Sequence, residues 1–229
     1  MIIDALHAWV LHKRWIGDTS ALVTFFTFEQ GIITSTCKGG RTPKKQALLQ
    51  EFTPLWLAIN QQGNHCYVRQ IEMMTAPLQL TGHGLFAALY VNELLYYFLR
   101  PNDESAKLYK AYESLLNALL VAQDRIEIEM ALRRFEWMLL VCCGYSMSLT
   151  YDIDGRLILA DRCYQLLNGE GFVEAKNGVS GRHIIAFSQD KFDDVETLKA
   201  VKWMMRRTIE FVLDGKPIRS RKLYQSLRT

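Results

Sequence analysis

The sequence has few cysteines, five among 229 residues, and no two of them form a C-x-x-C pair. A disulfide framework needs paired cysteines in an oxidising compartment, and a zinc ribbon needs two closely spaced thiol pairs. The sequence therefore disfavours both, and a reducing cytoplasm is the expected location. The cysteines are Cys37, Cys66, Cys142, Cys143 and Cys163.

Segments typical of membrane insertion or export are also lacking. The longest apolar run, residues 84–99, is interrupted by Asn92 and Glu93. It is too short to cross a hydrocarbon core of about 30 Å. The first four residues are MIID, so an aspartate stands where a secretory signal peptide has basic residues. We therefore expect no secretory signal peptide. The sequence thus predicts a globular protein that does not engage a membrane.

Catalytic motifs are absent too: no G-x-S-x-G, H-E-x-x-H, G-x-G-x-x-G or Walker pattern occurs. Asp152, Asp154 and Asp161 offer carboxylates for a divalent ion, but their spacing leaves a calcium loop incomplete. We therefore interpret the chain as a non-enzyme without a cofactor or bound metal. The alternative is a metal-dependent nucleic-acid-modifying enzyme, such as a nuclease, that uses the segment from Asp152 to Asp161.

Strand-forming residues are concentrated near the N-terminus. Five such strands within about 75 residues predict a small barrel, for which the oligonucleotide/oligosaccharide-binding (OB) barrel is the commonest candidate. A five-stranded sheet of SH3 type would have much the same pattern. The segments are residues 6–11, 21–26, 32–37, 55–59 and 66–71.

After Pro77 the apolar residues recur at helical spacing. The pattern predicts an α+β multidomain chain, with a five-stranded OB-fold barrel in residues 1–80 and a mainly α-helical domain in residues 81–229. Residues 145–190 lack a clear period, contain five glycines and are acidic, so we expect them to be irregular. The predicted helices cover about 86–97, 103–121, 126–143 and 195–213, with a short last helix at 220–227.

The formal net charge of +3 conceals an uneven distribution of charge. Residues 1–80 carry a net +2, residues 81–200 a net −5 and residues 201–229 a net +6. Two clusters of Lys and Arg have the charge needed to neutralise phosphates, although a solvated surface is the alternative for each. One is the basic loop, residues 38–45, with Lys38, Arg41, Lys44 and Lys45; the other comprises Arg206, Arg207, Lys216, Arg219, Arg221, Lys222 and Arg228.

An exposed aromatic ring would complete a single-strand binding site, because bases stack on such rings. Trp15 lies in the polar segment Lys13–Asp18 and is the best candidate in the barrel. The alternative is a rim residue that packs the mouth of the barrel.

Several motifs, in the same order along the chain, resemble the RecO family of bacterial recombination mediators. The stretch at 215–223 is the most specific of them. The motifs are AWVLH at 8–12, FTFEQG at 26–31, KGGR at 38–41, FTPL at 52–55, LYVNELL at 89–95, ALRRFE at 131–136, GY at 144–145, GR at 181–182 and GKPIRSRKL at 215–223.

The resemblance implies an OB barrel and a helical domain, and a role in RecF-pathway DNA repair in the cytoplasm, in association with the nucleoid. It implies binding of single- and double-stranded DNA, annealing of complementary strands, and assistance to RecA loading together with RecR. The DNA-binding residues that we predict are Lys38, Arg41, Lys44, Lys45, Arg206, Arg207, Arg219, Arg221 and Lys222.

The resemblance further implies that the helical domain binds the acidic, phenylalanine-ended tail of single-strand-binding protein. The family arginine that receives this tail corresponds to Arg133, with Leu132 beside it. A guanidinium suits that role because it holds a carboxylate in a bidentate pair. The alternative for Arg133 is a surface pair with Glu129, one turn earlier, or with Trp137, one turn later.

The sequence departs from many family members in its thiols. Those members carry a four-cysteine zinc module after the GY motif, whereas only Cys163 remains there, with Cys142 and Cys143 just before it. Three thiols without C-x-x-C pairs cannot complete a four-thiolate site. We therefore predict no structural zinc and interpret residues 145–190 as the remnant of that module.

Overall fold

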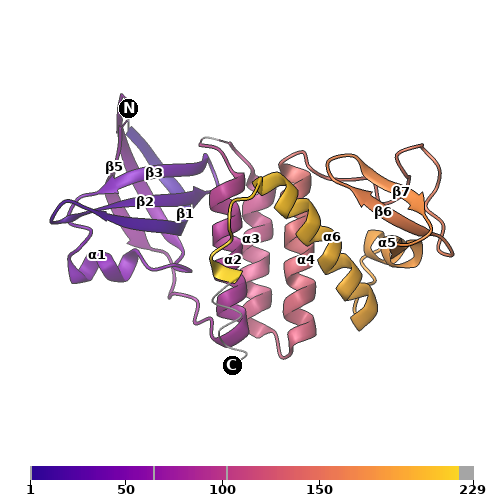
Figure 1. Ribbon diagram of the computed structural model, residues 1–229. Helices are drawn as coiled ribbons and strands as arrows, with labels where there is room; N and C mark the ends of the chain where they lie inside the picture. The colour runs from indigo at the N-terminus through magenta and orange to yellow at the C-terminus, as the bar shows by residue number, and fades with distance from the viewer. Residues whose placement is uncertain (1, 64, 102, 222–229) are drawn as a thin grey trace. The chain divides into compact units, whose positions relative to one another are not determined.

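The computed structural model describes residues 2–63, 65–101 and 103–221 (Figure 1). The chain forms two compact units. The first comprises Met1–Leu120 with the segment from Ile218 onwards, and the second comprises Val121–Pro217. The domain boundary predicted near residue 80 falls within the first unit, between the barrel and the helix that follows it, and stays a prediction.

Five N-terminal strands close into a barrel in the order β1-β2-β3-β5-β4 (Figure 1). The long strand β1 pairs with β2 along its second half and with β4 along its first, and its register shifts between Val10 and His12. A parallel contact of Thr36 with Tyr67 closes the barrel between β3 and β5. The predicted OB-type barrel followed by helices is confirmed. The strands are β1 (Ile2–Ile16), β2 (Ser20–Thr27), β3 (Gly31–Cys37), β4 (Leu55–Gln62) and β5 (His65–Met73).

The barrel is filled by apolar side chains that alternate along its strands, such as Val23 and Phe25 on β2 and Leu57 and Ile59 on β4. This alternation is what a strand with one face in the core requires. The filled interior holds the backbone of the strands rigidly, so the loops at their ends start from fixed positions.

The segment between β3 and β4 contains a short helix, α1 (Pro43–Leu48), which the sequence did not predict. Pro43 occupies its first turn, where a missing N–H is tolerated. At six residues, α1 is too short to show a helical period.

Two further helices belong to the first unit, α2 (Gly82–Phe98) and nearly all of α3 (Ala106–Val121). Buried Asn92 on α2 joins them to the barrel: its Nδ2 donates to the Val10 carbonyl at 3.4 Å, and its Oδ1 accepts from the Tyr112 hydroxyl at 2.6 Å. Burial raises the pKa of Tyr112 well above its ordinary value, which keeps the hydroxyl protonated as a donor.

The second unit contains three helices and a small sheet in the order β7-β6-β8. The prediction of irregular structure was wrong for residues 163–188. This part contains strands of five, five and two residues and a helix of eight residues, all too short to show a clear period. The predicted helix over 195–213 is confirmed. The elements are α4 (Arg125–Cys142), β6 (Cys163–Leu167), β7 (Gly171–Ala175), β8 (Val179–Ser180), α5 (Gly181–Ser188) and α6 (Val195–Leu213).

The predicted last helix, residues 220–227, lies almost wholly outside the described residues. Among the helices that are described, none combines the length and the apolar character needed to cross a membrane.

Candidate nucleic-acid interface

The basic loop is an ordered turn that leads into α1. Lys45 Nζ donates to the Lys38 carbonyl at 2.6 Å, and Thr42 Oγ1 donates to the Gly39 carbonyl at 2.8 Å. The Arg41 N–H donates to the Thr19 carbonyl at 3.1 Å, which ties the loop to the β1–β2 turn. The cations of this loop therefore project from a fixed backbone.

Two of these cations lie over aromatic rings of the barrel. The Arg41 guanidinium is 5.5 Å from the centre of the Trp15 ring, and Lys38 Nζ is 5.2 Å from that of Tyr67. Trp15, the candidate for an exposed aromatic ring, is 44% exposed. Lys44 and Lys45 follow on α1. This end of the barrel thus combines positive charge with stacking surfaces, the two features that single-stranded nucleic acid requires.

The C-terminal cluster is divided between the two compact units. Arg206 and Arg207 lie on α6 in the second unit, where Arg206 Nε pairs with Glu210 Oε1 at 2.8 Å. Arg219 and Arg221 belong to the first unit. Lys222 lies outside the described residues. The cationic cluster suggested by the sequence therefore draws its residues from both compact units.

Glu93 on α2 holds the chain at Arg219 and Ser220. Its Oε1 accepts from the Arg219 N–H at 2.8 Å, while its Oε2 accepts from the Ser220 N–H at 2.8 Å and the Ser220 hydroxyl at 2.6 Å. One turn earlier, the Tyr90 ring lies 5.6 Å from the Arg221 guanidinium. Two of the motifs noted in the sequence, at 89–95 and 215–223, therefore meet in the structure.

Arg133 lies in an ionic cluster and is only 5% exposed. Its Nη1 is 3.0 Å from Glu136 Oε2 and its Nη2 is 3.8 Å from Glu129 Oε2. Lys202 from α6 approaches Glu129 Oε1 at 2.5 Å, and Leu132 is buried beside the cluster. The pair with Glu129 does form, but inside the unit and not on its surface. The tail-binding role of Arg133 and Leu132 stays a prediction.

Two of the three aspartates of the enzymatic alternative, Asp152 and Asp154, have structural contacts. Buried Asp152 accepts hydrogen bonds from the N–H groups of Asp154 and Arg156, and the Asp154 carboxylate pairs with the Arg156 guanidinium. Within the described residues, no group of three or more His, Cys, Asp or Glu side chains is placed to hold a metal ion. These contacts build a tight turn, so the geometry offers the enzymatic alternative no support.

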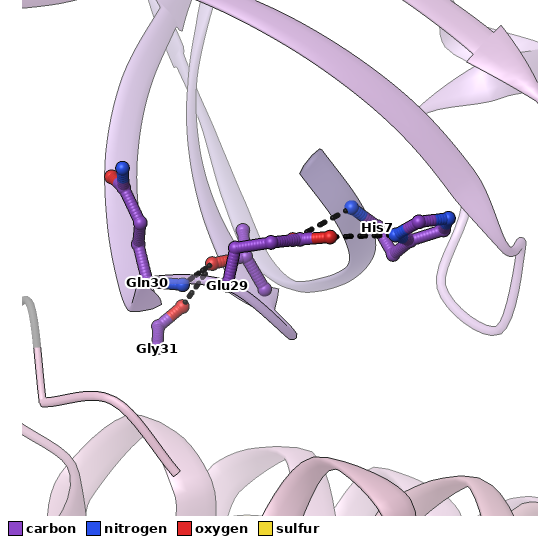
Figure 2. A network of polar contacts seen from close by, with 5 residues as sticks. His7, Glu29, Gln30 and Gly31 are labelled. Carbon is purple, nitrogen blue, oxygen red and sulfur yellow. Dashed lines mark hydrogen bonds and ion pairs between the residues drawn. The ribbon is translucent and has the colours of Figure 1, made fainter. Parts of the chain in front are cut away.

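A polar network that sequence reasoning missed fixes the β2–β3 turn (Figure 2). The main-chain N–H of His7 donates to Glu29 Oε2 at 2.9 Å, and the ring Nδ1 of His7 contacts Glu29 Oε1 at 2.6 Å. Within the turn, Thr27 Oγ1 accepts from the Gln30 N–H and donates to the Gly31 carbonyl. In the sequence, the FTFEQG motif at 26–31 was the available signal for this network. These contacts give the motif a structural role.

Comparisons with known proteins cover both parts of the chain. The family model described as Recombination protein O N terminal matches residues 1–76, and that described as Recombination protein O C terminal matches residues 79–222.

Curated relatives match over nearly their whole length. A DNA repair protein RecO from Legionella pneumophila (strain Corby) is 46% identical over 98% of this chain and 99% of its own. Proteins of the same name from Tolumonas auensis and Actinobacillus pleuropneumoniae serotype 7 are 34% and 33% identical, over 97% and 99% of this chain and 95% and 97% of their own. With the barrel, the helical part and the ordered motifs in place, the chain belongs to the RecO family of DNA repair proteins.

Proposed function

We propose that the chain acts as a recombination mediator in the RecF pathway, in the cytoplasm and at the nucleoid. It binds single- and double-stranded DNA, anneals complementary strands, binds the tail of single-strand-binding protein, and with RecR assists RecA loading. The observation that carries the DNA-binding part is the pairing of Arg41 with Trp15 and of Lys38 with Tyr67 at one end of the barrel. Membership of the RecO family supports the rest.

The mechanism follows from charge and stacking, and no covalent bond is made or broken. The basic loop neutralises phosphates and releases their counterions, while the partly exposed Trp15 ring, with Arg41 beside it, stacks on a base. Annealing brings two sets of phosphates together, so cations on separate surfaces suit it. Arg206 and Arg207 on α6, and Arg219 and Arg221 held at α2, supply those further cations.

Binding of the tail of single-strand-binding protein requires a terminal carboxylate to reach the Arg133 guanidinium. In the structure that guanidinium already pairs with the carboxylates of Glu136 and Glu129. The tail carboxylate would therefore exchange with one of these side chains, with Leu132 as apolar neighbour. Displacing a glutamate costs free energy, and this cost reduces the free energy gained when the tail binds. We therefore expect the tail to bind more weakly here than it would bind a freely exposed arginine.

Fluorescence anisotropy with a labelled oligonucleotide at about 50 mM and 200 mM salt tests the proposal. The variant K44E/K45E reverses two charges of the basic loop. We expect weaker binding, a shallower dependence of affinity on salt, and slower annealing of complementary strands. The matched control K107E/K191E reverses two exposed lysines outside the loop and should bind as the unmodified protein does. Equal affinity and equal salt dependence for the loop variant and the control would rule out this role of the loop.

A further inference from the structure

The second unit has a pocket of about 500 Å³ whose wall includes an exposed tryptophan. Trp203 on α6 is 42% exposed, an unusual position for the largest apolar side chain. The pocket is lined by Glu196, Lys199, Ala200 and Trp203 of α6, and by Gly178, Val179, Ser180 and His183 around β8 and α5.

The walls of this pocket are fixed before any ligand binds. Gly178 has φ +150°, and a Cβ there would come within 2.2 Å of the Tyr164 carbonyl oxygen, so a side chain at this position is excluded. His183 is held at both ring nitrogens: Nδ1 contacts Thr197 Oγ1 at 2.8 Å, and Nε2 accepts from Arg182 Nε at 3.3 Å. With Ala200 also small, an open space remains beside the indole ring.

Cations flank Trp203 along the same helix. Lys199 lies one turn before it, and Arg206 and Arg207 lie one turn after it. Lys199 and Arg206 pair with Glu196 and Glu210 at 3.0 Å and 2.8 Å. Both pairs are exposed, and exposed pairs contribute little free energy, so a phosphate can replace either glutamate.

We propose that this pocket binds a base of single-stranded DNA, stacked on Trp203, with the flanking phosphates on Lys199 and Arg206. The inference rests on the proposed DNA binding and adds a second contact site, on the other compact unit from the basic loop. From Lys199 to Arg206 the cations extend over about 10 Å of helix. That spread fits a chain of phosphates better than the single terminal carboxylate of a peptide.

The test compares W203A with W203F by anisotropy, using a thymidine oligonucleotide and an abasic oligonucleotide of equal length. Loss of the ring should weaken thymidine binding about fivefold or more and leave abasic binding unchanged, because only bases stack. W203F keeps an aromatic face and should bind within about twofold of the unmodified protein. The matched control F211A removes another exposed aromatic of α6 and should leave both affinities unchanged.

A second measurement locates the contact directly. Ultraviolet crosslinking of an oligonucleotide carrying 5-bromouracil should give a peptide adduct at Trp203, and this adduct should be lost in W203A.

Three results would overturn the inference. The first is that W203A binds the thymidine oligonucleotide as the unmodified protein does. The second is that W203A loses thymidine and abasic binding equally. The third is that W203A loses only its binding of an acidic, phenylalanine-ended peptide. In each of these the unmodified protein still binds DNA, so the proposed function stands. If the unmodified protein binds neither oligonucleotide, the proposed function fails together with the inference.

Discussion

Glu93 and Ser220, 127 positions apart in the sequence, are joined through both the main-chain N–H and the hydroxyl of Ser220. The same carboxylate also accepts from the Arg219 N–H. A single helix side chain therefore fixes the main chain at Arg219 and Ser220. Hydrogen bonds to an ionised acceptor are roughly twice as strong as neutral ones, which suits one residue to this task.

Replacing Glu93 should release the chain from Arg219 onwards. E93A loses three acceptor contacts, and we expect a decrease of about 1–3 kcal/mol in the free energy of unfolding. Trypsin should cleave after Arg219 and Arg221 faster than in the unmodified protein. E93Q retains acceptor capacity on one oxygen and should show an intermediate rate. Urea titration and timed proteolysis with mass spectrometry measure both effects. Equal cleavage rates for E93A and the unmodified protein would contradict this role.

The contact between Glu93 and Ser220 also illustrates the limit of the sequence. Runs of strand-forming residues predicted five barrel strands. Helical spacing predicted α2, α3, α4 and α6, because each of these helices is long enough to show its period. A hydrogen bond across 127 positions leaves no local pattern. Both partners lie in motifs that the sequence singled out, but only the fold shows that these motifs touch.

Arg133 shows a second limit. It lies beside Leu132 and before Phe135, so the sequence places it next to the apolar face of α4 without showing whether it faces solvent. In the structure it faces inward together with Glu129 and Glu136, all three buried. At the edge of an apolar helix face, the spacing of residues does not show whether a charged side chain is buried or exposed. Oppositely charged side chains on the same helix can pair with such a residue and allow it to be buried.

Removing Arg133 should destabilise the chain as well as weaken tail binding. The variant removes the guanidinium from two buried carboxylates, of which Glu129 keeps its contact with Lys202. Breaking a buried pair from one side costs about 3–5 kcal/mol. Thermal and urea unfolding measure this cost. The double variant R133A/E136A should recover part of it, because the buried carboxylate nearest to the guanidinium is removed as well.

Tail binding is then measured separately, by titrating an acidic, phenylalanine-ended peptide into R133A at a temperature where the variant is folded. The control R134A removes an exposed arginine that pairs with Asp190 and should leave peptide affinity and stability nearly unchanged. Full peptide affinity in folded R133A would place the tail elsewhere, and unchanged stability would contradict the buried cluster.

The buried Tyr112 hydroxyl makes the first unit sensitive to high pH. Burial raises its pKa well above the ordinary value of 10. In the unfolded chain the phenol ionises near pH 10, whereas the folded chain keeps it protonated. Its contribution is therefore fully present below pH 10 and is lost as pH rises above that value.

We accordingly expect the stability of the protein to fall between pH 9 and pH 11, with about 1 kcal/mol of the loss at pH 11 due to Tyr112. Y112F removes the ionisable group, so its stability should fall less steeply over the same range. At pH 7 the order reverses: Y112F should be less stable than the unmodified protein by about 1–3 kcal/mol, because Asn92 Oδ1 loses the hydroxyl that donates to it at 2.6 Å. Urea titrations of both proteins at pH 7, 9, 10 and 11 separate the two effects, and parallel pH profiles would show that Tyr112 does not carry the alkaline loss.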